Sequence, residues 1–183
     1  NSGNNPIFPM TRKVLLPRDM ESRLDTLTGL VQEVDGILLY RRQGDYCPLE
    51  QIFMTGVGTE GHVQAHPERM EVANEFFRRN PDYQFVKFHT HSKGTIRKFG
   101  DYYARHFSQG DIDGIKEQLR NNRDFIAMLV TPETKLLSGI DNPELMVLNG
   151  FRGYQNRSQA VSQALKVIAG NLGYDISGLP ATR

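Results

Sequence analysis

The stretch Tyr83-Gln-Phe-Val-Lys-Phe-His-Thr-His91, with Ser108-Gln-Gly-Asp111 after it, decides the fold. Apolar residues alternate through its first part, which predicts a strand from residue 83 to residue 89. Residues two apart on a strand point to the same face, so His89 and His91 present their rings side by side where it ends. A helix is predicted over residues 108–121, and Asp111 falls in its first turn.

Helices and strands are predicted on both sides of this stretch. Met20, Leu24 and Leu27 recur at helical spacing, which predicts a helix over residues 18–33, closed by Asp35-Gly36. The other predicted elements are strands at 37–40, 51–55, 125–131, 135–140 and 144–148, and helices at 67–80 and 157–173. Residues 92–107 have no clear period. This order predicts one α/β (α+β) domain over residues 1–183, with a central sheet flanked by helices.

Composition is ordinary for a globular domain. The 183 residues are 38% hydrophobic and 23% charged, and 22 basic against 21 acidic side chains leave a net charge of +1. This balance gives no reason to expect nucleic acid or a membrane surface as a partner. The single cysteine, Cys47, excludes an internal disulfide and is typical of a reducing compartment. No apolar run approaches the roughly 20 residues of a membrane span. We therefore expect a cytoplasmic protein, with residues 1–12 as a flexible tail.

Two imidazoles and one carboxylate are the protein ligands of many hydrolytic zinc sites, which keep a further position open for water. His89, His91 and Asp111 supply this set, and Glu33 stands far upstream as a candidate base. Ser108 with an acid three residues later also fits a capping box, a structural role that is compatible with metal binding. Asp101 and His106 remain alternative third ligands.

A glutamate, then His-x-His, then Ser-x-x-Asp is the motif of a known family. Here the three parts are Glu33-Val-Asp-Gly36, His89-Thr-His91 and Ser108-Gln-Gly-Asp111. The chain resembles the JAMM/MPN+ zinc metalloproteases over about residues 18–150 in the order of its elements. The resemblance implies an MPN-type (cytidine-deaminase-like) fold with a mostly antiparallel sheet and one Zn²⁺ per chain on His89, His91 and Asp111.

The chain departs from the family pattern after the second histidine. Sixteen residues separate His91 from Ser108, more than the family has, and Ser92 stands where a proline is usual. We interpret residues 93–107 as an insertion near the active site. Its aromatic and basic side chains suit a segment that covers the cleft, holds substrate or blocks access, and equally a solvated surface loop without a role.

The resemblance also implies an activity. Glu33 would act as general base and Ser108 would donate a hydrogen bond to the developing oxyanion. The expected enzyme is a zinc isopeptidase that removes a ubiquitin-like modifier from lysine or from a precursor, with a proteasome-like or other MPN-containing assembly as a possible setting. The alternatives are a prokaryotic-type peptidase that processes a sulfur-carrier or other small modifier, and a non-catalytic MPN scaffold.

A second motif is set aside. Gly56-Val-Gly-Thr-Glu-Gly61 fits a dinucleotide-binding pattern, but no helix opens at these glycines because Pro67 delays it. We expect a loop there, with His62 and His66 as surface histidines.

Overall fold

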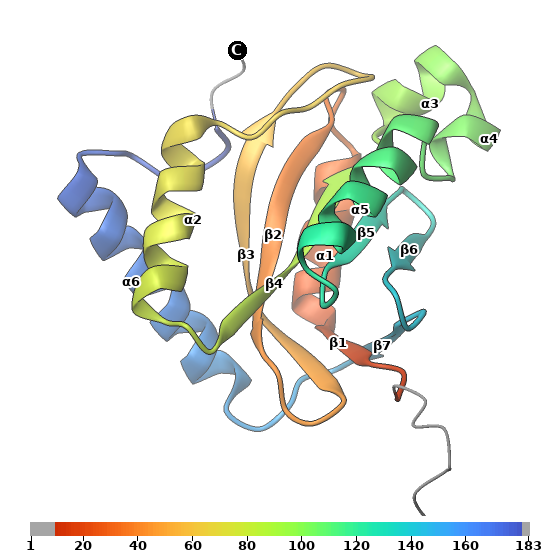
Figure 1. Cartoon of the computed structure of the whole chain (residues 1–183). Helices are drawn as coiled ribbons and strands as arrows, with labels where there is room; N and C mark the ends of the chain where they lie inside the picture. The colour runs from red at the N-terminus through yellow and green to blue at the C-terminus, as the bar shows by residue number, and fades with distance from the viewer. Residues whose placement is uncertain (1–9, 181–183) are drawn as a thin grey trace, which may run out of the picture.

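Strand β2 (Val34–Arg41) lies at the centre of a seven-stranded sheet in the computed structural model, which describes residues 10–180 (Figure 1). The strand order is β6-β5-β4-β2-β3-β1-β7. The other strands are β1 (Lys13–Pro17), β3 (Tyr46–Val57), β4 (Tyr83–Thr90), β5 (Ile126–Val130), β6 (Lys135–Ser138) and β7 (Glu144–Leu148). The predicted α/β class, with helices around one sheet, is confirmed.

The sheet mixes both kinds of pairing. The two longest ladders join β2 to β3 and to β4 and are antiparallel, as is the β5–β6 pair. By contrast, β4 runs parallel to β5, and β1 runs parallel to both β3 and β7. Antiparallel pairing therefore dominates the centre of the sheet, while parallel pairs extend it on both sides.

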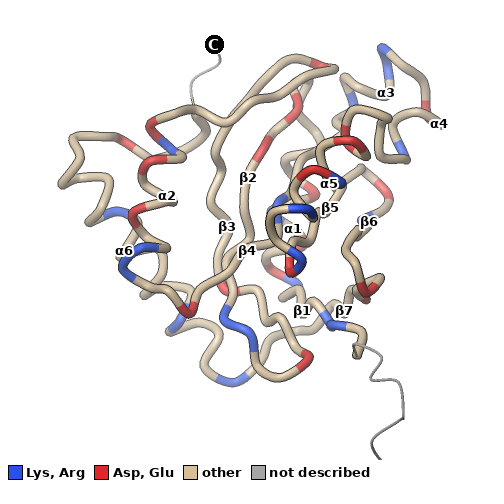
Figure 2. Tube along the Cα trace, viewed as in Figure 1, with Lys and Arg blue, Asp and Glu red and all other residues tan. Residues whose placement is uncertain are grey.

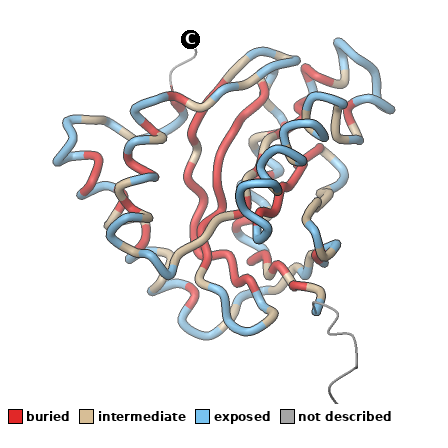
Figure 3. The backbone as a smooth tube through the Cα atoms, in the orientation of Figure 1, coloured by how far each residue is buried: buried red, intermediate tan, exposed pale blue. Residues whose placement is uncertain are grey.

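Each face of the sheet buries its own apolar core. Along β2, Ile37 and Leu39 pack against α2 (Pro67–Arg79) and α6 (Tyr154–Leu172), whereas Leu38 and Tyr40 join the core that holds α1 (Arg18–Thr28). This division follows from the two-residue period of a strand. Figure 1 shows α2 and α6 together on one side of the strands. Strands β2 and β3, at the centre of the sheet, are thus buried on both faces, and Figure 3 shows them mostly as buried.

The remaining helices surround the end of β4. Residues 93–107, which show no period in the sequence, contain the short helices α3 (Lys93–Phe99) and α4 (Asp101–Ala104). The next helix, α5 (Gln109–Asn121), lies beside β4 and β5 and has no buried residue (Figures 1 and 3). Its half-buried residues are Asp111, Ile115 and Leu119, each one turn from the next.

Several predicted boundaries are wrong. The strands predicted at 37–40 and 51–55 are longer, Val34–Arg41 and Tyr46–Val57, and the one predicted at 135–140 ends at Ser138. The first helix ends at Thr28 rather than at residue 33, because the backbone N–H of Gly29 caps it and the chain then turns toward β2. The predicted tail ends earlier than residue 12, since Arg12 is buried and pairs with Asp141 at 2.7 Å. The rest of that prediction, residues 1–9, lies outside the described residues.

None of the helices within residues 10–180 has the length and apolar content needed to cross a membrane.

Candidate metal centre

Three side chains from two elements meet at the carboxyl end of β4. His89 and His91 flank the last residue of this strand, and Asp111 comes from the first turn of α5. Their ligand atoms all lie within 4.8 Å of one another, and they are the one group among residues 10–180 that could hold a metal ion. The structure therefore brings together the three ligands predicted from the sequence.

The orientation of His91 suits a metal ligand. Its Nδ1 lies 2.9 Å from the carbonyl oxygen of Ala104, which can only accept a hydrogen bond, so Nδ1 carries a proton. The other nitrogen, Nε2, faces Asp111 Oδ2 at 3.6 Å. A backbone carbonyl that fixes the tautomer in this way is a common feature of metal-binding histidines. Burial alone would lower the pKa of His91, but hydrogen bonding to Asp111 and Ala104 outweighs it and raises that pKa.

Asp111 is held from both sides. Its Oδ2 accepts a hydrogen bond from the backbone N–H of Ser108 at 2.8 Å and lies 3.2 Å from His89 Nε2. In return, the Ser108 hydroxyl oxygen accepts from the N–H of Asp111 at 3.1 Å, which completes the predicted capping box. Burial would raise the pKa of Asp111, but the two histidines reverse its effect and lower the pKa strongly. The aspartate is therefore an anion, as a metal ligand must be.

Glu33 stands beside this group although it is distant in sequence. It lies in the turn before β2, with its backbone N–H bonded to the carbonyl oxygen of Thr59. Its Oε1 is 4.0 Å from His91 Nε2 and accepts a hydrogen bond from Thr95 Oγ1 at 3.3 Å. Burial raises the pKa of Glu33, and the nearby histidines only partly offset that effect.

The two alternative third ligands are placed elsewhere. Asp101 is exposed and pairs with Arg105 at 2.9 Å. His106 is exposed, and its Nδ1 lies 2.7 Å from the carbonyl oxygen of Tyr102. Residues 93–107 still contribute to the site, because Ala104 holds His91 and the ring of Tyr103 stacks on His91 with centroids 5.8 Å apart. This segment is a structural wall of the metal group and not a detached loop.

A cleft of about 500 Å³ opens from the metal group along the sheet. Gly110 and Gly114 of α5 and its N-cap residue Ser108 form one wall. On the floor, Lys87 forms an ion pair with Asp35, whose other oxygen accepts a hydrogen bond from Thr55 at 2.8 Å. Figure 2 shows acidic positions at the upper end of β2.

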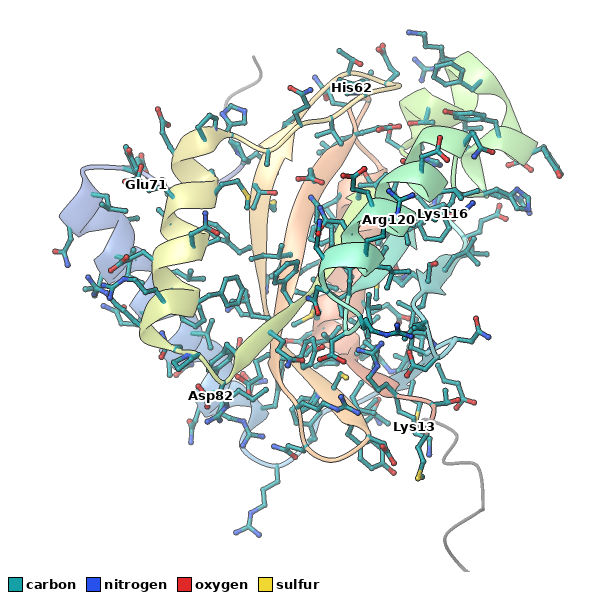
Figure 4. All side chains as sticks on the ribbon, viewed as in Figure 1. Lys13, His62, Glu71, Asp82, Lys116 and Arg120 are labelled. Carbon is teal, nitrogen blue, oxygen red and sulfur yellow. The ribbon has the colours of Figure 1, made fainter. Side chains whose placement is uncertain are left out.

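Sequence reasoning missed several residues of the cleft. Lys87 precedes His89 by two positions and so shares its face, a signal that was present in the strand pattern. Asp35 reaches the cleft only because it pairs in register with His89, which no local pattern reveals. His62 is exposed as expected and lines the cleft at the top of the molecule in Figure 4, whereas the expectation of a surface position is wrong for His66, which is 7% exposed.

Comparisons with known proteins do not assign a family. No family model matches the sequence, and no curated protein matches it. Among solved structures, the chain is similar to protein DSY2949 from Desulfitobacterium hafniense, with 16% identity and a TM-score of 0.47 over 78% of this chain and 97% of that chain. A likeness at this level identifies neither a family nor a function.

Proposed function

We propose that this protein is a zinc-dependent isopeptidase of the JAMM/MPN+ type, which cleaves a ubiquitin-like modifier from lysine or from a precursor. The observation that supports this most is the position of Glu33. A buried carboxylate that faces a His-His-Asp group but lies outside the ligand cluster is the arrangement that metal-assisted hydrolysis requires of its general base.

The donor set fits zinc. Nitrogen and carboxylate oxygen are ligands that Zn²⁺ accepts, and three protein ligands leave a further position for substrate or water. His89, His91 and Asp111 would hold the ion. When bound, zinc supplies Lewis acidity, which polarises a carbonyl group and makes water a stronger nucleophile at neutral pH.

Two residues of the chain handle protons and charge beside this group. Glu33 Oε1 accepts the proton of the attacking water and passes it to the leaving amine, and the Thr95 hydroxyl keeps that oxygen in place. The Ser108 oxygen already accepts from the N–H of Asp111, so its own O–H is free to donate to the oxyanion that develops on the scissile carbonyl.

The glycines of α5 leave room in the cleft for an extended substrate. Gly110 and Gly114 line it, and a Cβ added at Gly114 would meet nothing within 4 Å. The Gly-Gly end of a ubiquitin-like protein is a chain without side chains, which suits a wall of this kind. Peptidase action on a sulfur-carrier or other small modifier uses the same chemistry and remains the second candidate. The scaffold alternative is disfavoured because all five motif residues converge on one site.

Zinc content and cleavage, measured on the same samples, test the proposal. We expect about one zinc per chain in the wild type and a large loss in Asp111→Ala, with Asp113→Ala as the control on the exposed side of α5. Fusions of ubiquitin and of a sulfur-carrier protein, each joined through Gly-Gly to a reporter, distinguish the two substrate classes. Wild-type protein that binds no zinc after reconstitution, or that binds zinc and cleaves neither fusion, would contradict the proposed activity.

A further inference from the structure

A second cleft, of about 520 Å³, shares no lining residue with the cleft at the metal group. It lies between β3, α2, α6 and the segment 174–178 that follows α6. Its volume falls in the range of small-molecule sites, about 300–1,000 Å³.

The charged groups of this second cleft are unbalanced. Arg23, Arg69 and Lys166 line it, and within residues 10–180 none of the three has a carboxylate within 4.0 Å. Asp175 is the one acidic residue of the lining, and both the N–H and the hydroxyl of Ser177 donate to its Oδ1. Three cations therefore face this space with a single, already solvated and hydrogen-bonded anion among them.

Arg69 is the unusual member of the three because it is only 6% exposed. Its guanidinium donates to the carbonyl oxygens of Met54 at 3.2 Å and of Gly178 at 3.3 Å, and it lies 5.8 Å from the centroid of the Phe53 ring. These partners orient the group but do not neutralise it. Asp175 attracts this charge only from beyond 4.0 Å, and a buried charge without a contacting counter-ion is costly. A guanidinium has five N–H donors, of which the two carbonyls use two.

Part of the lining of the second cleft is apolar. Leu165 and Ala169 of α6 are buried beneath it, and Ile176 closes it from the segment that follows the helix. A ligand in this space would therefore meet both a fixed cation and aliphatic side chains.

We propose that this second cleft binds a small organic anion, with its carboxylate or phosphate group on Arg69 and an apolar body against Leu165 and Ile176. Arginine is suited to this task because its planar fork matches either anion with two parallel hydrogen bonds. Arg23 and Lys166, both exposed, add attraction at the mouth of the cleft.

Titrations followed by amide NMR test the proposal on the full chain. The probes are phenyl phosphate, benzoate and the neutral benzyl alcohol, each raised to millimolar concentration. We expect saturable shifts confined to β3, α2, α6 and residues 174–178 for at least one of the two anions, and the tighter of the two identifies the anionic group. Benzyl alcohol should bind at least tenfold more weakly.

Variants separate the site from general attraction. Arg69→Met should abolish binding of the anion, and Lys166→Met, whose side chain is exposed, should weaken it severalfold without altering the fold. Lys116→Met on α5, which carries its charge on another face (Figure 4), is the matched control and should bind as the wild type does. If Arg69→Met does not fold, the affinity of Lys166→Met for the anion, compared with that of Lys116→Met, decides. Absence of saturation with both anions, equal binding of benzyl alcohol, or equal weakening in Lys116→Met would each overturn the proposal.

Discussion

Glu33 shows how a side chain is prepared by residues that are remote in sequence. Its backbone is fixed to Thr59 in the loop after β3, and its carboxylate is fixed by Thr95 at the start of α3. The single proton of the Thr95 hydroxyl is shared between Glu33 Oε1 at 3.3 Å and the carbonyl oxygen of Glu60 at 2.8 Å, so one hydroxyl links this loop to the glutamate. The glutamate is therefore positioned before any substrate arrives, which lowers the cost of orienting a base during reaction.

Glu33→Gln tests the role of this carboxylate. The amide keeps the shape of the side chain but cannot accept a proton from water, so cleavage should fall by about 10²–10⁴-fold while zinc stoichiometry stays the same. Both are measured on one preparation, with the exposed Glu117→Gln on α5 as the control. Wild-type turnover in Glu33→Gln would remove Glu33 from the mechanism, and loss of zinc would make it a ligand.

Helix α5 shows how one element serves the site at the expense of packing. Glycine in a helix costs stability relative to alanine because the unfolded chain is more flexible, yet Gly114 lies inside α5 with open space around it. Gly36 has the opposite surroundings, since a Cβ there would stand 2.8 Å from the carbonyl oxygen of Phe53 and against the Phe88 ring.

The same substitution at these two glycines should have effects of opposite sign. Gly114→Ala should raise the free energy of unfolding by about 0.5–1 kcal/mol, the difference in helix propensity. Gly36→Ala should lower it by about 1–3 kcal/mol, because the added methyl group overpacks the centre of the sheet. Urea unfolding measures both. A destabilised Gly114→Ala would mean that the cleft wall is closed in solution.

Elements with a strong local period were predictable from the sequence. Helix α2 begins at Pro67 and ends before Asn80-Pro81, as its start and stop residues predict, and the strand that carries His89 and His91 lies where alternation placed it. Because the ligand spacing depends on this strand and on the cap of α5, the candidate metal group could be predicted as well.

Elements that depend on distant partners were not predictable. Strand β1 has only five residues and is defined by pairing with β3 and with β7, which lies more than a hundred positions further along the chain. Helices α3 and α4 are too short to show a period and are held by the capping box at Ser92 and by contacts around the metal group. For these segments, tertiary contacts decide the conformation that propensity leaves open.

At the scale of the whole molecule, one ion pair ties the beginning of the described chain to its last strands. Arg12 donates from Nη2 to Asp141 Oδ1 at 2.7 Å and from Nε to Oδ2 at 2.9 Å, and its Nη1 donates to the carbonyl oxygen of Asp124 at 2.6 Å. Both side chains are almost fully buried, at 3% and 4% exposure. The hydrogen bonds from Arg12 lower the pKa of Asp141 below its ordinary value.

Asp141→Asn should lower the free energy of unfolding by about 3–5 kcal/mol at neutral pH, because it leaves the Arg12 charge buried and unpaired. The pKa of Asp141 is lower in the folded state, so its stabilisation is complete above the ordinary value of about 3.9 and is lost as pH falls toward the folded value. The free energy of unfolding, measured with urea from pH 7 to pH 2, should therefore fall less steeply at acid pH in the variant than in the wild type. The exposed control Asp113→Asn should keep the pH dependence of the wild type. An unchanged pH dependence in Asp141→Asn would contradict the stabilising role of the Arg12–Asp141 pair.

The absence of a buried residue in α5 has a consequence for amide hydrogen exchange. Segments with few buried apolar contacts open locally at low free energy. Amides of α5 should therefore exchange through local openings, whereas amides of β4 should exchange only through global unfolding. An ion shared by β4 and Asp111 would close off these openings, and the measured affinity for metal would then include the free energy needed to keep the helix folded in place.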